Sequence, residues 1–161
     1  MAIWVCRAGK KAVYVEEFLK QEKIFCTWDG FDYDLNLYDD KEKLKEKIRK
    51  EKKDAEPTAI NTWAAQLMCL KEKMQNGDIV LTPNENSKSY NIGIIIGVYE
   101  YKSEVPEHFR HGRQVRWLPD IIFRDKMPQY MIYSLGAYRT IFNLKYENEF
   151  VELLAKLGIP I

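Results

Sequence analysis

The chain has 161 residues, of which 46% are apolar and 30% charged, as in ordinary folded proteins that bury a core without added cross-links. Its 25 basic and 24 acidic residues leave a net charge of +1, so the overall charge gives no indication of a nucleic-acid partner. The apolar stretches are far shorter than the ~20 residues of a membrane span and no signal-peptide pattern is present, so we expect a cytoplasmic protein with no membrane partner.

The first half of the chain is expected to alternate between strands and helices. The pattern predicts a strand over 2–7, an amphipathic helix over 13–22, a strand over 24–28, a charged helix over 39–53 and an apolar helix over 60–74. The apolar helix is expected to be buried, because its large side chains recur at helical spacing. Thr58 is its expected N-cap, and Asn76-Gly77 its expected C-cap.

The second half is expected to be mostly β-structure. Strands are predicted over 78–82, 91–99, 114–118 and 140–144, and a last short helix over 148–157. A polar hairpin loop is predicted over 84–89, and a longer loop that holds both histidines over 102–112. Together these elements predict one α+β domain over residues 1–161.

The sequence contains no recognisable catalytic signature. It lacks a GxSxG phrase, a P-loop and a GxGxxG phrase. His108 and His111 are interpreted as loop residues, and neither has a cysteine near it, so no metal site is predicted. A metal-dependent nuclease needs a second carboxylate and a lysine at strand spacing, and neither follows Asp120 or the pair Asp125-Lys126 at that spacing. We therefore expect a non-catalytic protein with no cofactor.

Aromatic residues are abundant, at 13% of the chain, and include four tryptophans. Trp4, Trp63 and Trp117 are expected in the core because they lie within predicted strands or on the buried helix face. Trp28 differs, because it ends a strand directly before the Asp29-Gly30 turn. An indole at such a rim can stack on a nucleobase, which contributes ~1–3 kcal/mol. The alternative is a rim tryptophan that covers the core.

Five short phrases occur in order along the chain: IWVCRAG from Ile3, CTWDG from Cys26, MQNGDIVLTP from Met74, NIGIIIGVYEY from Asn91 and QVRWLPDII from Gln114. In this order they resemble the EVE, YTH and PUA-like group of small nucleic-acid readers. Within that group they most resemble the N-terminal reader domain of Mrr- and McrB-type modification-dependent restriction proteins. The resemblance covers residues 1–118 as a core, and residues 119–161 resemble an extension specific to the restriction-linked subgroup.

The resemblance implies a small twisted β-barrel of about five to six strands flanked by helices. It also implies recognition of modified, methylated DNA by flipping a base into an aromatic pocket, as the specificity module of a restriction or antiviral defence system. Flipping costs a few kcal/mol, which stacking would offset. A nuclease or ATPase effector would then lie in a fused or partner domain.

The same resemblance implies two sets of site residues. The base pocket is expected to comprise Trp28, Asp29, Ala8, Gly9, Trp63, Tyr99 and Tyr101. The phosphate contacts are expected to come from Arg7, Lys10, Arg110 and Arg113. Strand alternation would place both tyrosines on one face of the pocket. For the tyrosines the alternative is core packing, and for the two loop arginines it is solvated surface charge.

Three other functions stay open on the sequence. A PUA-like RNA-binding module is the first, and a small enzyme that acts on a modified nucleobase, with Asp29 as its acid or base, is the second. The third is a protein-interaction domain. The sequence also departs from the wider family in two places, because Ala8 stands where a polar residue is common and the segment 31–56 is long and charged.

Overall fold

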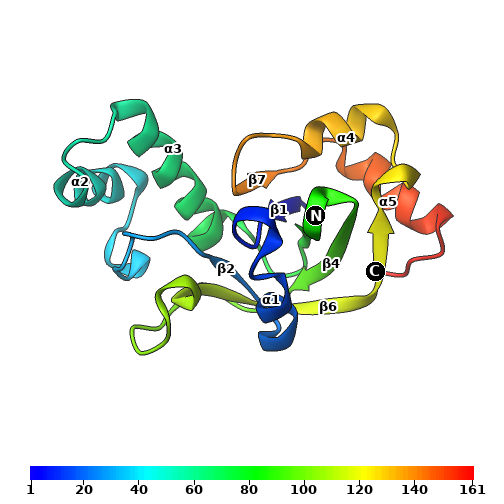
Figure 1. The fold of residues 1–161 in the computed structure, drawn as a ribbon, viewed down its shortest axis with the longest axis horizontal. Helices are drawn as coiled ribbons and strands as arrows, with labels where there is room; N and C mark the ends of the chain where they lie inside the picture. The colour runs from blue at the N-terminus through cyan, green and yellow to red at the C-terminus, as the bar shows by residue number, and fades with distance from the viewer.

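The computed structural model describes all residues 1–161 and consists of a curled mixed β-sheet with α-helices around it (Figure 1). The strands are β1 (Ile3–Cys6), β2 (Lys23–Cys26), β3 (Ile79–Pro83), β4 (Ser89–Ile95), β5 (Glu100–Tyr101), β6 (His111–Phe123) and β7 (Ile141–Asn143). The α-helices are α1 (Val15–Gln21), α2 (Lys41–Glu51), α3 (Pro57–Met68), α4 (Gln129–Leu135) and α5 (Glu147–Lys156).

The sheet has the strand order β2-β6-β4-β3-β1-β7, and β5 pairs with β6 outside this path. Only β1 and β3 run parallel, and the other pairs are antiparallel. The sheet curls until β1, the neighbour of the end strand β7, approaches β2 at the opposite end, since the Cys6 thiol of β1 donates to the Phe25 carbonyl of β2 at 3.5 Å. The predicted α+β class is confirmed, in the form of a half-barrel of seven strands.

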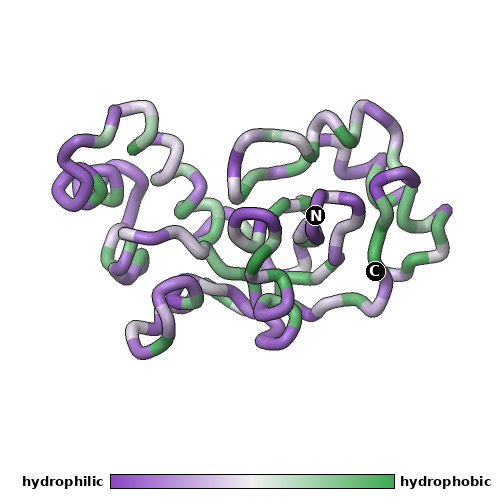
Figure 2. The backbone as a smooth tube through the Cα atoms, viewed as in Figure 1, coloured by the Kyte–Doolittle hydropathy of each residue, from purple (hydrophilic) through white to green (hydrophobic).

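The two faces of the sheet bury two separate hydrophobic cores. Side chains alternate along β1, so Trp4 and Cys6 enter the core beneath α1, α2 and α3, whereas Ile3 and Val5 enter the core beneath α4 and α5. Figure 2 shows α2 as mostly hydrophilic, and the core receives only Leu44 and Ile48 from it. None of the helices is both long and apolar enough to cross a membrane.

Asp78 explains the phrase MQNGD in structural terms. Its buried carboxylate accepts hydrogen bonds from the Trp4 ring N–H at 3.0 Å, the Ala2 amide at 3.1 Å and the Gln75 amide at 2.9 Å. These bonds fasten the start of β1 to the turn that leads into β3. The phrase therefore positions strands and does not itself form a site.

Several predicted elements need correction. The apolar helix begins at Pro57 with Glu56 as its N-cap, so Thr58 is not the cap; proline suits this first position because it lacks an N–H that would have no partner there. The helix continues as one π-helical turn over Cys69–Lys73 and ends at Met74, before Asn76-Gly77. The elements β5 and α4 were not predicted, and β6 extends over 13 residues.

Candidate functional site

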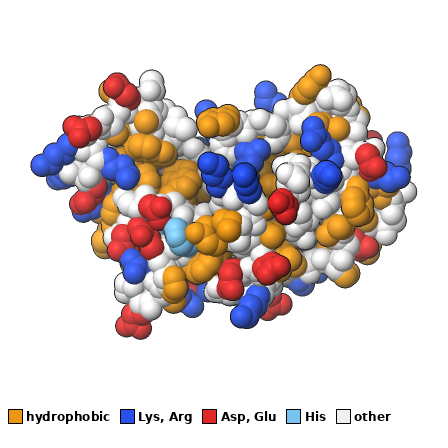
Figure 3. Space-filling model, viewed as in Figure 1, with side chains coloured by type: hydrophobic (Ala, Val, Ile, Leu, Met, Phe, Trp, Pro, Cys, Tyr) orange, Lys and Arg blue, Asp and Glu red, His pale blue; other side chains and the backbone are white.

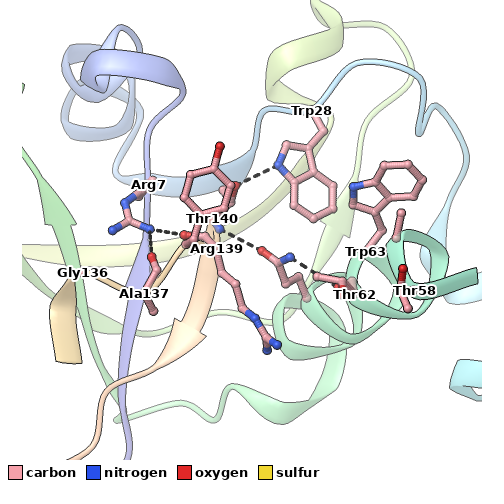
Figure 4. A pocket seen from close by; sticks show the side chains of 12 residues that line it. Arg7, Trp28, Thr58, Thr62, Trp63, Gly136, Ala137, Arg139 and Thr140 are labelled. Atoms are coloured by element: carbon pink, nitrogen blue, oxygen red, sulfur yellow. Dashed lines mark hydrogen bonds between the residues drawn. The ribbon is translucent and has the colours of Figure 1, made fainter. Parts of the chain in front are cut away.

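Two adjoining cavities open beside Trp28, and together they form what we term the indole hollow. Their volumes are about 680 and 610 Å³, within the range of roughly 300–1,000 Å³ typical of ligand sites. Arg7, Trp28, Trp63 and Thr140 line both cavities. Figure 4 shows the two indoles side by side, one from the segment after β2 and the other from α3. The structure thus brings two of the sequence-predicted pocket aromatics together.

Phe31 packs against both indoles and holds them in place. Its ring centroid lies 5.3 Å from that of Trp28 and 5.5 Å from that of Trp63. The ring N–H of Trp28 donates to the Thr140 hydroxyl at 3.1 Å, and the Lys52 ammonium lies 4.7 Å from the centre of the Phe31 ring. Both indoles are half-buried, so each keeps part of its surface at the hollow.

Arg7 fastens the wall of the hollow that lies between α4 and β7. Its guanidinium donates to the carbonyls of Leu135 at 3.0 Å, Ala137 at 2.7 Å and Arg139. These hydrogen bonds use three of the five N–H donors that a guanidinium carries. Burial also lowers the pKa of Arg7. The main partners of Arg7 are therefore carbonyls of this wall, whereas the sequence predicted a phosphate contact.

Gln66 ties the same wall to α3. Its buried side-chain carbonyl accepts the Thr140 amide at 2.9 Å and the Ile141 amide at 3.0 Å. A buried amide without an acceptor costs about 1–3 kcal/mol, so these two hydrogen bonds strongly constrain the segment. The wall that carries Tyr138 and Arg139 is consequently held at both ends.

Positive charge predominates around the hollow. Arg7, Lys10, Lys52 and Arg139 line it, and Asp29 is its one carboxylate. Figure 3 shows lysine and arginine side chains gathered near the centre of this face, next to apolar side chains. A cavity with flat apolar walls and a cationic border suits an aromatic ligand that carries negative charge.

The turn that follows β1 forms one edge of the hollow. Gly9 lines it with a φ of 77°, and a Cβ at this position would lie 2.6 Å from the Tyr14 ring, so glycine is required on both grounds. Ala8 is fully buried and lines neither cavity, which corrects its predicted place in the base pocket. Neither the Ala8 amide nor the Gly9 amide donates to a backbone carbonyl.

Asp29 lies at the rim with its side chain 78% exposed. Its carboxylate oxygen is 3.6 Å from Nδ1 of His108, and that nitrogen also lies 3.0 Å from the Thr27 carbonyl. The His108 ring stacks on Tyr14 at 4.7 Å and lines the hollow. The histidine that the sequence assigned to a solvated loop therefore belongs to the edge of the site.

Tyr99 and Tyr101 do not line the hollow, which corrects their predicted place in the base pocket. Strand β4 ends before them, and both rings pack around His111, at centroid distances of 6.0 and 5.1 Å. The Tyr99 hydroxyl donates to Nδ1 of His111 at 2.7 Å, and Nε2 donates to the Phe31 carbonyl at 2.5 Å. Burial lowers the pKa of His111. The Tyr101 hydroxyl donates to Asp32 at 2.5 Å.

The two loop arginines are also engaged within the chain. Arg110 pairs with Asp32 at 2.5 Å, so its charge is already balanced. Arg113 is 3% exposed and donates to the carbonyls of Met74 at 2.6 Å and Gly97 at 2.9 Å. The phosphate contact predicted for Arg113 is wrong, because its guanidinium is buried and donates to the carbonyls of the π-helical turn inside the protein. Burial also lowers its pKa.

The remaining polar groups include no metal-binding cluster and no disulfide. No group of three or more histidine, cysteine, aspartate or glutamate side chains lies close enough to hold a metal ion. The three cysteines are unpaired, with Cys6 and Cys26 buried and Cys69 half-buried. Burial raises the pKa of Cys26 to about 12, so this thiol stays protonated.

Most of the residues that line the hollow were absent from the sequence prediction, among them Lys52, Gln66, Tyr138 and Arg139. Gln66 carried a detectable signal, because it is a polar residue among the apolar positions of a buried helix. Tyr138 and Arg139 lie in a segment with no periodic pattern, so nothing local indicated that it would turn back toward Trp28. Tyr138 is fully exposed at the edge of the hollow.

Comparison with known proteins gives a family and a distant structural likeness. No curated protein matches the chain. A protein from Agrobacterium tumefaciens, whose X-ray structure came from a structural genomics consortium, aligns with 99% of this chain and 94% of its own at 14% identity and a TM-score of 0.44. The family described as a domain of unknown function, DUF8426, matches residues 4–145, a range that includes every residue of the indole hollow. The chain therefore belongs to the DUF8426 family.

Proposed function

We propose that this chain is a non-catalytic reader of modified DNA and that the indole hollow takes a base turned out of the duplex. The observation that carries the proposal is the pair of half-buried indoles, Trp28 and Trp63, which face one hollow from separate elements. Each flat indole face can stack on a base with ~1–3 kcal/mol, enough to offset the few kcal/mol that flipping costs.

The resemblance to EVE, YTH and PUA-like readers gains support from where its phrases lie. The phrase IWVCRAG forms β1 and the turn at Gly9, and CTWDG forms the end of β2 and the turn that carries Trp28. Both turns border the indole hollow. We therefore propose a small PUA-like half-barrel architecture for the chain, as the specificity module of a restriction or defence system whose nuclease or ATPase is a separate domain or protein.

The charges of the hollow fit the same role. Lys10 and Arg139 are exposed and form no ion pair within the chain, so they are available to phosphate groups beside the flipped base. The unbonded amide of Gly9, which lines the hollow, can donate to the edge of the base. An apolar wall would favour a methylated base, because burial of one methyl group stabilises by about 0.8 kcal/mol.

The proposal is tested by a low-salt binding titration on matched duplexes. The set contains unmodified DNA and DNA with N6-methyladenine, 5-methylcytosine or 5-hydroxymethylcytosine, with single-stranded RNA alongside. We expect one modified duplex to bind at least about tenfold more tightly than the unmodified one, a difference of ~1.4 kcal/mol. Equal binding to all duplexes would contradict the proposal, and preferential binding to RNA would favour the RNA-binding alternative.

Substitution of the indoles links this preference to the hollow. Trp28→Ala and Trp63→Ala should each weaken binding to the preferred duplex by about tenfold to a hundredfold, since each removes a stacking surface of ~1–3 kcal/mol. Phe123→Ala is the matched control, because this aromatic ring is 51% exposed at the end of β6 and lines neither cavity. Thermal unfolding of each variant separates a loss of binding from a loss of fold.

A further inference from the structure

A second hollow, of about 780 Å³, lies on the other side of the segment between α4 and β7. It is bordered by the end of α3 and its π-helical turn, by α4 and by β7. Figure 1 shows this segment in orange, reaching from α4 back to β7 opposite α3. Gln66, Ala137 and Arg139 line both this cavity and the indole hollow, so the two hollows adjoin.

The charge of the second hollow is entirely positive. Its 15 lining residues include Lys73, Arg139 and Lys145 and no aspartate or glutamate. All three cations are exposed, and none of their charged groups forms an ion pair or a hydrogen bond within the chain. Three like charges around one concavity repel one another, and an anionic ligand would relieve that repulsion.

Three tyrosine rings also line the second hollow. Tyr130 and Tyr146 pack edge to face at a centroid distance of 4.8 Å, and Tyr133 presents a side chain that is 74% exposed. Cations interleaved with exposed aromatic rings suit a strand of nucleic acid, because the ammonium groups meet phosphates while the rings stack on bases. An acidic peptide would use the charges but not the rings.

We propose that the second hollow holds the part of the DNA strand that continues from the base in the indole hollow. Arg139 lies at the junction and contacts the phosphate between the two parts. Lys73 and Lys145 neutralise the next phosphates, and Tyr133 stacks on a neighbouring base. The inference rests on the proposed function for the position of the flipped base, whereas the backbone contacts of this hollow do not depend on a base modification.

The test compares two double variants with the same change in net charge. Lys73→Gln with Lys145→Gln removes both lysines of the second hollow. Lys20→Gln with Lys156→Gln is the control, because these exposed lysines lie on α1 and α5 and border neither hollow. The affinity for the modified and unmodified duplexes is measured over a range of salt concentrations, from which the slope of log K against log salt is obtained.

Loss of the two hollow lysines should reduce this slope by about two, because each phosphate contact contributes about one. It should also weaken binding to the modified and the unmodified duplex about equally, by roughly tenfold at low salt. The control variant should keep the slope of the wild type. Tyr133→Ala should weaken binding without changing the slope, since the ring carries no charge.

The outcomes separate the two proposals. If the wild type prefers a modified duplex but both double variants behave alike, the second hollow is not a backbone site and the reader proposal stands. If the wild type shows no preference and only the hollow variant loses slope, the backbone site stands and the reader proposal fails. Displacement of DNA by polyglutamate as effectively as by an oligonucleotide of equal charge would overturn the assignment to nucleic acid.

Discussion

Arg7 and Lys10 lie three residues apart at the indole hollow, but only the Arg7 side chain forms hydrogen bonds within the chain. Arg7 donates to three carbonyls of the wall, whereas Lys10 is exposed and forms no ion pair. Arg7→Met should therefore lower the free energy of unfolding by about 2 kcal/mol, through the loss of hydrogen bonds from a charged donor. Chemical denaturation measures this change.

Lys10→Met is the matched control for this experiment. It should leave the free energy of unfolding within about 0.5 kcal/mol of the wild type, because its side chain is at the surface. It should reduce the salt slope of DNA binding by about one instead. If Arg7→Met were as stable as the wild type, the carbonyl bonds would not hold the wall, and Arg7 would be free to act as the phosphate contact that the sequence indicated.

At the scale of elements, the segment that follows β2 is positioned by the segment 99–111. Four residues of this segment were expected in a pocket or in a loop, but they contact the chain after β2 instead. Tyr101 and Arg110 bond to Asp32, the Tyr99 hydroxyl accepts the Leu35 amide, and His111 donates to the Phe31 carbonyl. Because Phe31 packs against Trp28 and Trp63, this network determines where the two indoles lie.

The network predicts a pH dependence of stability through His111. The folded protein holds the ring neutral, between a hydroxyl that donates and a carbonyl that accepts, and its pKa lies below the ordinary value of 6.5. Below pH 6.5 the unfolded chain binds a proton more readily than the folded chain does, so stability should fall as the pH drops below 6.5 and be fully present above that pH.

Unfolding titrations between pH 5.5 and 7.5 measure this dependence, with His111→Gln as the comparison. The variant should be less stable throughout but should vary less across this range. The depressed pKa of Asp32 does not interfere, because its contribution to stability is lost only as the pH falls below its ordinary value of 3.8. An equal pH dependence in the two proteins would assign the effect to another group.

Local patterns predicted the elements that depend on local interactions. The apolar spacing predicted α3, and the charged repeat with Leu44 and Ile48 predicted α2. The end of a strand directly before Asp29-Gly30 indicated that Trp28 would lie at a rim, and it lines both cavities of the hollow. The placement of Arg7 could not be predicted, since its partners are 128 to 132 residues away along the chain.

The same limit explains the errors at Tyr99, Tyr101 and Arg113. A continuous strand to residue 99 was expected, but β4 ends at Ile95, and the tyrosines beyond it turn toward His111. Arg113 has the composition of a surface cation, but β6 begins at His111, which carries Arg113 into the interior beside the carbonyls that end the π-helical turn. Tertiary contacts determined both positions.

For the whole molecule, the net charge of +1 conceals a separation of charge. The indole hollow has four cations to one carboxylate, and the second hollow adds two lysines. On our account these adjoining hollows form one surface, on which stacking selects the base and the exposed cations bind the backbone. Under the proposed function, a nearly neutral protein would bind DNA through one face alone.

The most direct test of the central claim is the NMR response of the four tryptophan ring N–H groups to the preferred modified duplex. Trp28→Phe and Trp63→Phe assign the two resonances of the hollow. Trp117 serves as the internal reference, because its ring N–H is bonded to the Phe18 carbonyl and it lines neither hollow. We predict that the Trp28 and Trp63 signals shift at saturation while the Trp117 signal stays in place. Saturable binding that leaves both hollow indoles unchanged would contradict the account.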